Sequence, residues 1–204
     1  VRWKPFVERH GTRRQDDLQH CHSLVSTTFN MVDLLQPYVQ LDGMLMVRAT
    51  HVHEHGEGEL KRDVLLPNKT DEKDLQEYLA FVDRFRHLPN FKAWNDAFLL
   101  QFAAKCPEIF PTSAREVMKQ LAQEKPNEVL AFQAVEYFDY MLYAIEQRVT
   151  IGHKDCLAQV FQGCKPVLDN LATKLPGFGQ VIWTPELISW CEEMAVGGNL
   201  ERPK

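Results

Sequence analysis

The sequence predicts an all-α fold, and three observations favour it. Apolar residues recur at helical spacing along most of the chain, strand-like patterns are scarce, and the segments between the expected helices are short. The chain has 204 residues, of which 45% are apolar and 25% are charged. This composition is ordinary for a globular protein that is large enough to bury a core. We therefore expect a bundle of helices.

In the first half of the chain, prolines separate three expected helices. These helices span about residues 16–36, 71–87 and 90–105, and they are followed by Pro37, Pro89 and Pro107. An apolar stretch over 41–49 and a histidine-rich run over 51–59 lie between the first two helices. Residues 63–70, which include a proline and an asparagine, are expected to form a loop.

In the second half, capping signals mark where helices begin. Ser113 and Glu116 predict a capping box, in which each side chain satisfies the free backbone N–H of the other residue. A second long helix is expected over 126–149. Residues 154–174 are also expected to be helical, although Gly163 and Pro166 should break or kink this helix.

The last helix has the clearest start. In Thr184-Pro185-Glu186, the hydroxyl can cap the helix, the proline suits the first turn, and the acid lies near the positive end of the helix dipole. Two glycines, Gly197 and Gly198, are expected to end this helix.

Charge, cysteine content and hydropathy narrow the classes of function. The formal net charge of -5 gives no general reason to expect a nucleic-acid partner. The five cysteines are odd in number and widely spaced, and they form no CxxC motif, which argues against a disulfide framework or a zinc knuckle. No apolar run approaches the roughly 18 residues of a membrane span, and no signal peptide is visible. We expect a cytoplasmic protein with reduced thiols and no membrane partner.

The first candidate site residue is a histidine on an otherwise apolar helix face. This face is shared by Leu18, His22, Val25, Phe29 and Val32, at steps of four, three, four and three residues. We therefore expect His22 to point inward. His20 lies about 200° away around the helix and is expected to point elsewhere. An inward histidine is either a hydrogen-bonded core residue or a metal ligand.

The second candidate is a carboxylate on an apolar stripe. Asp139 shares a helix face with Phe132, Val135 and Leu142. A carboxylate at such a position must be paired, protonated or bound to a metal, because uncompensated burial of charge is strongly unfavourable. A salt bridge to an arginine, or a position at the end of the stripe that reaches water, is the alternative to metal binding.

The third candidate is the run from His51 to Glu59, which holds three histidines and three glutamates within nine residues. On a helix, His53 and Glu54 point about 100° apart, so both can reach a metal that lies between them. Glu57 lies one turn beyond His53 and can face the same cavity. Imidazole and carboxylate ligands suit Mn, Fe, Co or Zn. The alternative is a solvated acidic turn with incidental histidines.

Taken together, these residues resemble the H…HD…D signature of the HD-domain phosphohydrolases. The matching residues, in order, are His22-Ser23, the doublet His53-Glu54 followed by Glu57, and Asp139. The pattern is most similar to the branch that includes 5'-deoxynucleotidases, and the resemblance covers about residues 9–148. Two differences stand out. Glu54 occupies the position of the family's aspartate, and the arginine–tryptophan pair that precedes the first histidine in such nucleotidases is not at its usual distance.

The resemblance implies an HD-domain-like helical bundle over residues 1–150. Residues 151–204 lie beyond the matching pattern, and we expect them to form a C-terminal helical extension packed on the same domain. The resemblance also implies one divalent ion (Mn, Co, Fe, Mg or Zn) bound by His22, His53, Glu54 and Asp139. A metal-activated water would attack the phosphorus of a nucleotide or a related small phosphate ester. Glu57 would handle the proton, and Arg9, Arg13 and Arg14 would bind phosphate. A homodimer is compatible with this interpretation.

Three other interpretations bear on the same residues. A two-iron oxygenase of this fold needs extra histidines between the doublet and the final aspartate, and between His55 and Asp139 only His87 is available. An inactive HD-like binding protein stays open because of Glu54. His51-x-x-Glu54-His55 also matches the H-x-x-E-H motif of inverted zinc metallopeptidases, whose glutamate is the base. A third zinc ligand would then be Glu128 or Glu136.

Overall fold

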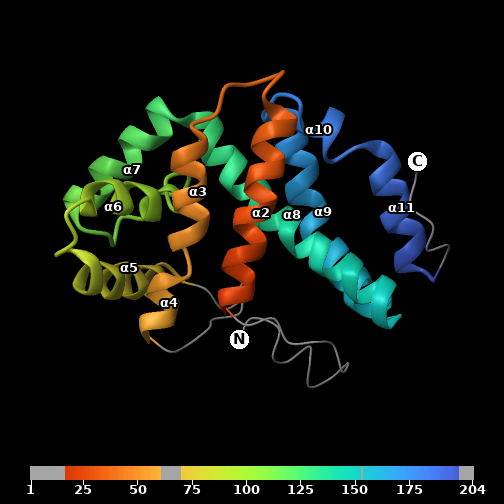
Figure 1. Cartoon of the computed structure of the whole chain (residues 1–204), viewed down its shortest axis with the longest axis horizontal. Helices are drawn as coiled ribbons and strands as arrows, with labels where there is room; N and C mark the ends of the chain where they lie inside the picture. The colour runs from red at the N-terminus through yellow and green to blue at the C-terminus, as the bar shows by residue number, and fades with distance from the viewer. Residues whose placement is uncertain (1–16, 61–69, 153, 198–204) are drawn as a thin grey trace.

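The computed structural model describes residues 17–60, 70–152 and 154–197, and all the regular secondary structure in these ranges is helical (Figure 1). The predicted all-α class is therefore confirmed. The helices are α2 (Asp17–Leu35), α3 (Gly43–Val52), α4 (His55–Leu60), α5 (Asp71–Phe85), α6 (Phe91–Leu100), α7 (Thr112–Glu124), α8 (Pro126–Ile151), α9 (Lys154–Lys174), α10 (Phe178–Val181) and α11 (Pro185–Ala195). None of these helices is long and apolar enough to cross a membrane.

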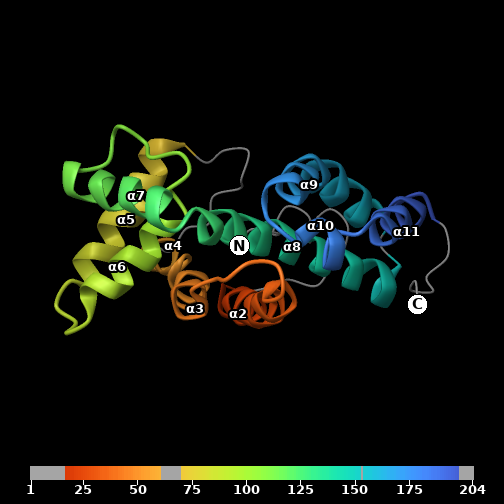
Figure 2. The same cartoon turned by 90° about the horizontal axis from the view of Figure 1, so that it is seen from above.

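The long helix α8 lies in the middle of the fold and contacts α2, α3, α6, α7 and α9. Seen from above, α2 and α3 lie on one side of α8, and α9 lies on the other (Figure 2). At one end, α5 packs on α4, α6 packs on α3, and α7 packs on α6 and α8. At the other end, α11 packs on α9. This arrangement places the lower end of α2, the end of α3 and the middle of α8 next to one another (Figure 1).

One apolar core runs through all of these contacts. Its largest fully buried side chains come from most of the helices and from the segments before α7 and after α10, and they include Leu24, Phe81, Phe98, Phe132 and Trp183. Residues 154–195 therefore share the core of the earlier helices. The indole N–H of Trp183 donates a hydrogen bond to Asp169 Oδ1 at 2.8 Å, which satisfies its polar atom at the edge of the core.

The loop between α2 and α3 is tied to the start of α8. Asp42 is the N-cap of α3, where its side chain accepts a hydrogen bond from the backbone N–H of Leu45 at 3.0 Å. The other oxygen of Asp42 lies 3.2 Å from Lys125 Nζ, and its backbone N–H donates to Glu128 Oε1 at 2.8 Å. These contacts fix α3 relative to α8, and the candidate site lies at the far end of α3.

The starts of two helices test the capping predictions. Thr184 caps α11 as predicted, because its hydroxyl accepts a hydrogen bond from Leu187 N at 3.3 Å and Pro185 opens the helix. The predicted Ser113–Glu116 capping box is wrong. The N-cap of α7 is Pro111, so Ser113 already lies within the first turn and makes no cap hydrogen bond.

A break at Gly163 and Pro166 does not occur, since α9 is one helix that continues through both residues, and the kink stays a prediction. Apolar residues on both sides of the proline, including Phe161, Cys164 and Leu168, are buried in the core. This packing outweighs the hydrogen bond that the proline removes from the helix.

Candidate metal centre

The His53-Glu54 doublet lies at the junction between α3 and α4 rather than within one helix. His53 is the C-cap of α3, with helical backbone angles, and its N–H donates to Ala49 O at 3.0 Å. The close approach of α4 to α5 fixes the turn that follows. A Cβ atom at Gly56 would lie 2.8 Å from the carbonyl carbon of Glu77, so only glycine fits this position.

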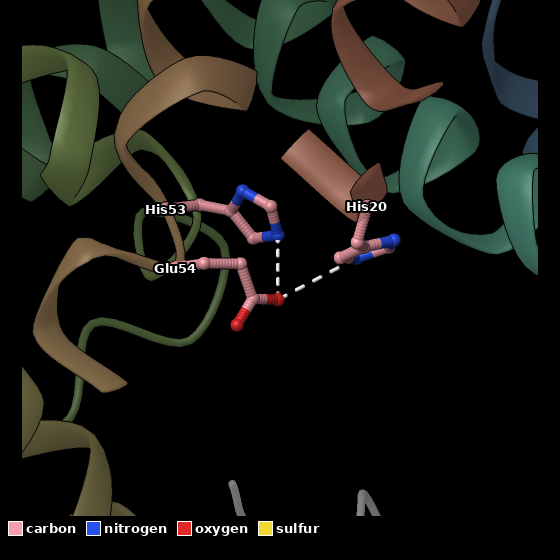
Figure 3. Close-up of side chains that lie close together, drawn as sticks. All are labelled: His20, His53 and Glu54. Atoms are coloured by element: carbon pink, nitrogen blue, oxygen red, sulfur yellow. Dashed lines mark ion pairs between the residues drawn. The ribbon is translucent and has the colours of Figure 1, made fainter. Parts of the chain in front are cut away.

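Three buried side chains meet at this junction: His20 from α2, and His53 and Glu54 from the turn (Figure 3). Each offers a ligand atom, and these atoms all lie within 4.8 Å of one another. Glu54 Oε1 lies 2.9 Å from His53 Nε2 and 3.5 Å from His20 Nε2. The group can hold a metal ion, because two imidazole nitrogens and a carboxylate oxygen converge from two separate helical segments.

The other ring nitrogen of His53 indicates which atom is available for a metal. His53 Nδ1 lies 3.0 Å from the carbonyl oxygen of Thr50, and a carbonyl oxygen can only accept a hydrogen bond. Nδ1 therefore carries the proton. In the neutral ring, Nε2 then presents a lone pair to the Glu54 carboxylate and makes no hydrogen bond within the described residues. In that tautomer Nε2 and the Glu54 oxygen, 2.9 Å apart, can both bind one ion that lies to the side of the line joining them.

Asp139 lies beside this group, on α8. Its Oδ1 accepts hydrogen bonds from Ser23 Oγ at 2.6 Å and Thr27 Oγ1 at 3.0 Å. Its Oδ2 lies 3.4 Å from Nδ1 of His20. Asp139 is 1% exposed, as the apolar stripe on α8 predicted for an inward residue. It contacts His20 rather than belonging to the three-residue group, so its role as a metal ligand stays a prediction.

Aromatic side chains of α8 hold the two histidine rings. Tyr140 stacks on His20, with ring centroids 5.9 Å apart and an interplanar angle of 7°. Phe132 meets His53 edge-on at 6.0 Å. The rings of His20 and His53 are themselves 5.5 Å apart. Packing on these faces restricts ring rotation, so the nitrogens keep their directions.

The electrostatics of the site also suit a cation. Glu54 and Asp139 are both buried, and His20 and His53 are neutral when each presents one lone pair. The two carboxylates lie on either side of the His20 ring, 3.5 Å from Nε2 and 3.4 Å from Nδ1, so an ion bound at this group would have two acidic side chains close to it. The donor set combines imidazole nitrogen with carboxylate oxygen, which suits Zn, Mn, Fe or Co better than a soft thiolate-seeking metal.

The structure corrects the predicted orientation of α2. His22 is exposed, whereas His20, which the sequence pattern directs elsewhere, is 6% exposed and joins the group. The buried face of α2 instead consists of His20, Leu24, Thr27, Thr28, Met31 and Leu35. Phe29, which lies on the predicted face, is 60% exposed. The spacing of Leu24, Met31 and Leu35 could have revealed this face, but the two threonines between them concealed it.

The remaining predicted site residues are not part of the group. Glu57 is buried, at 4% exposure, in the first turn of α4, one turn after Glu54. Glu57 is therefore close to the doublet in the sequence, but it is not one of the three residues whose ligand atoms converge. Arg9, Arg13 and Arg14 lie outside the described residues.

The histidines of the metallopeptidase motif lie elsewhere. The rings of His51 and His55 are 5.3 Å apart and line a small pocket of about 90 Å³ with Trp94 and Phe85. Burial lowers the pKa of His55, and the neighbouring His51 and His53 lower it further. Within the described part of the chain, His51 and His55 form no ligand group with Glu54.

The two glutamates considered as a third zinc ligand have other contacts. Glu128 accepts a hydrogen bond from the backbone N–H of Asp42, in the loop that precedes α3. Glu136 accepts a hydrogen bond from the hydroxyl of Tyr140, one turn later on α8. Neither belongs to a ligand group in the described ranges. The geometry thus favours the centre built on His20, His53 and Glu54.

Comparisons of this chain with protein-family models, with curated proteins and with solved structures found no match. The geometry of the candidate centre and the sequence pattern are therefore the two grounds on which a function can be proposed.

Proposed function

We propose that this protein is a metal-dependent phosphohydrolase that acts on a nucleotide or a related small phosphate ester. The observation that carries the proposal is the buried meeting of His20, His53 and Glu54, with Nε2 of His53 2.9 Å from the Glu54 carboxylate and Nδ1 against the carbonyl of Thr50. The HD-domain resemblance supports phosphoryl chemistry as the reaction, because its doublet and its final aspartate are the residues that lie at or beside this group.

The fit of the residues to a divalent ion defines the roles that we assign. His20, His53 and Glu54 would hold the ion, and Asp139 lies against His20. When bound, the ion would polarise a phosphoryl oxygen and lower the pKa of a coordinated water. Zinc, manganese, iron and cobalt all suit this donor set, and magnesium suits it less because it prefers oxygen ligands.

The other groups of the mechanism come from this chain. Glu57, which is buried one turn after Glu54, is the proposed acceptor of the proton that the attacking water loses. Arg9, Arg13 and Arg14 are the proposed phosphate-binding residues, since a guanidinium can bind two phosphate oxygens at once. Burial of the histidines and of Glu54 keeps bulk water away from the ligand atoms.

A phosphate-release assay tests the proposal. The purified protein is incubated with nucleoside mono-, di- and triphosphates and with sugar phosphates, in the presence of Mn²⁺, Co²⁺ or Mg²⁺. We expect phosphate release from at least one substrate, and we expect a chelator to abolish it. A protein that binds one equivalent of metal and releases phosphate from none of these substrates would contradict the proposed reaction.

A matched pair of histidine variants separates this site from the metallopeptidase alternative. His53→Ala should eliminate both the bound metal and the phosphate release. His51→Ala should retain both, because His51 is exposed and lies outside the ligand group. If His51→Ala lost the metal and His53→Ala kept it, the ligand assignment would be wrong and the H-x-x-E-H interpretation would be favoured.

A further inference from the structure

We propose that Asp139 is a positioning residue that orients His20 toward the metal, and that the hydroxyls of Ser23 and Thr27 hold Asp139 for this role. The inference rests on the metal centre of the proposed function, and it differs from the resemblance, which implies that Asp139 is itself a ligand. It concerns the contact between α2 and α8 beside the centre.

Two hydroxyls of α2 hold one oxygen of Asp139. Ser23 and Thr27 are four residues apart and therefore lie on one face of the helix. Ser23 Oγ donates to Asp139 Oδ1 at 2.6 Å, and Thr27 Oγ1 donates to the same oxygen at 3.0 Å. Two donors on one oxygen fix the rotation of the carboxylate. The other oxygen, Oδ2, is then directed toward a single place.

That place is the ring of His20. Oδ2 of Asp139 lies 3.4 Å from His20 Nδ1, is buried, and makes no hydrogen bond within the described residues. The opposite ring nitrogen, Nε2, lies 3.5 Å from Glu54 Oε1. A carboxylate beside Nδ1 favours the tautomer with the proton on Nδ1, which leaves the lone pair on Nε2 for a metal.

The two histidines are thus oriented by the same principle. A backbone carbonyl, Thr50 O, accepts from Nδ1 of His53, and a carboxylate faces Nδ1 of His20. In both rings Nε2 faces Glu54. Groups of this kind behind a ligand histidine raise its basicity and fix its direction. The polar residues on the buried face of α2 therefore have a role that their packing alone does not explain.

Thr28 provides a matched control on the same helix. It is buried, like the neighbouring Thr27, but its hydroxyl donates to Leu24 O at 2.7 Å and lies 3.1 Å from Thr50 Oγ1. The hydroxyl of Thr28 therefore contacts the Leu24 carbonyl and Thr50, and not Asp139. A Thr→Val change at either position removes one hydroxyl and keeps the shape of the side chain, so only the loss at 27 should affect the centre.

The first experiment titrates Co²⁺ into the full chain and follows its visible absorption. Removing an oriented partner behind a ligand histidine weakens metal binding by about 10–100-fold. We expect a loss in this range for Asp139→Asn and for the double variant Ser23→Ala/Thr27→Val, with the stoichiometry and the shape of the spectrum kept. Thr28→Val should bind Co²⁺ as the wild type does, and Thr27→Ser, which retains the hydroxyl, should keep the wild-type affinity.

The second experiment reads the tautomer of His20 in the metal-free protein by long-range ¹H–¹⁵N NMR. The wild type and Thr28→Val should carry the proton on Nδ1 of His20, and the Ser23→Ala/Thr27→Val variant should show a mixture of tautomers. Thermal unfolding checks that each variant is folded. A wild-type ring protonated on Nε2 would overturn the inference.

The outcomes separate this inference from the proposed function. If the wild type binds no Co²⁺, both fail together. If the wild type binds Co²⁺ and the Ser23→Ala/Thr27→Val variant binds it equally well, the inference alone is overturned. A change in the shape of the Co²⁺ spectrum in Asp139→Asn, as expected when a ligand is lost, would also overturn it and make Asp139 a ligand.

Discussion

His20 Nε2 lies 3.5 Å from Glu54 Oε1, although α2 carries the histidine and the turn between α3 and α4 carries the glutamate. This contact is long-range in the chain, so it exists only when the helices are packed. It also selects one of the two histidines in His20-Cys21-His22 for the centre. Metal binding and folding are therefore expected to depend on each other.

The two histidines of α2 give the first prediction. His20→Ala should lose the bound metal, because it removes one of the three converging ligand atoms. His22→Ala should keep it, because His22 is exposed. The metal-to-protein ratio after dialysis measures both variants. Loss of metal in His22→Ala together with retention in His20→Ala would restore the face of α2 that the sequence pattern predicted.

Bound metal should also stabilise the folded chain. The ligands come together only in the native state, so an ion that binds there raises the free energy of unfolding. At a free metal concentration one hundred times the Kd, the gain is about 2.7 kcal/mol. Thermal unfolding with and without Zn²⁺ or Co²⁺ measures the effect. His53→Ala serves as the control and should show no rise in Tm.

The glycines of α4 give opposite predictions for the same substitution. Gly56→Ala places a methyl group against the backbone of Glu77 on α5, and overpacking of this kind destabilises by about 1–3 kcal/mol. Gly58 is exposed, and a methyl group there would have nothing within 4 Å, so Gly58→Ala should stabilise by about 0.5–1 kcal/mol. Denaturant unfolding compares the two. Equal effects would contradict the close packing of α4 on α5.

Helix capping gives a further pair of predictions about stability. Thr184→Ala removes the hydroxyl that accepts the N–H of Leu187, and the loss of such a cap costs about 1 kcal/mol of stability. Ser113 is exposed and makes no cap hydrogen bond, so Ser113→Ala should change stability by no more than about 0.5 kcal/mol. Urea unfolding midpoints measure both variants. A larger loss at Ser113 would indicate that the capping box forms after all.

Buried thiols predict a loss of stability at alkaline pH. Burial, with a smaller contribution from Glu136, raises the pKa of the Cys164 thiol from 9.0 to about 12. Below the unfolded pKa both states are protonated, so the stability is fully present. Above it the unfolded chain releases the proton first, and stability falls as pH rises toward the folded pKa.

This effect is measured as the difference between urea midpoints at about pH 8 and about pH 10.5, where only the unfolded thiol ionises. Cys164→Ala should reduce the difference, because the ionising group is gone. Cys106→Ala, at a half-buried position, controls for the substitution itself. An unchanged difference in Cys164→Ala would show that this thiol does not contribute to the alkaline loss.

Much of the architecture follows from local sequence. The apolar periodicity predicts the all-α class, and the prolines that begin α8 and α11 place the starts of those helices. Local signals were less reliable where tertiary packing competes with them. Pro166 remains inside α9, and the helix that Ser113 was expected to cap already begins at Thr112. These differences arise because helix ends and interior prolines depend on what the surrounding helices bury.

For the candidate site, too, some features were predictable from the sequence and others depended on tertiary packing. The inward position of Asp139 was predictable from the sequence, because a charged residue on an apolar stripe is a local feature. The dense run of histidines and glutamates marked His53 and Glu54 as candidate ligands, but it did not decide that they are buried. The choice of His20 over His22 was not predictable. On α2, Phe29 and its apolar neighbours suggest one face, while Thr27 and Thr28 belong to the face that is buried.

The sequence by itself determined that the chain is helical and that a histidine–glutamate doublet and an inward aspartate are present. The tertiary structure alone decided which face of α2 meets them. The physical reason is that a hydroxyl or an imidazole can be buried only where another element supplies its partner. Asp139 on α8 accepts a hydrogen bond from the hydroxyl of Thr27, and the hydroxyl of Thr28 lies 3.1 Å from that of Thr50 on α3. These partners allow the polar residues of α2 to face inward.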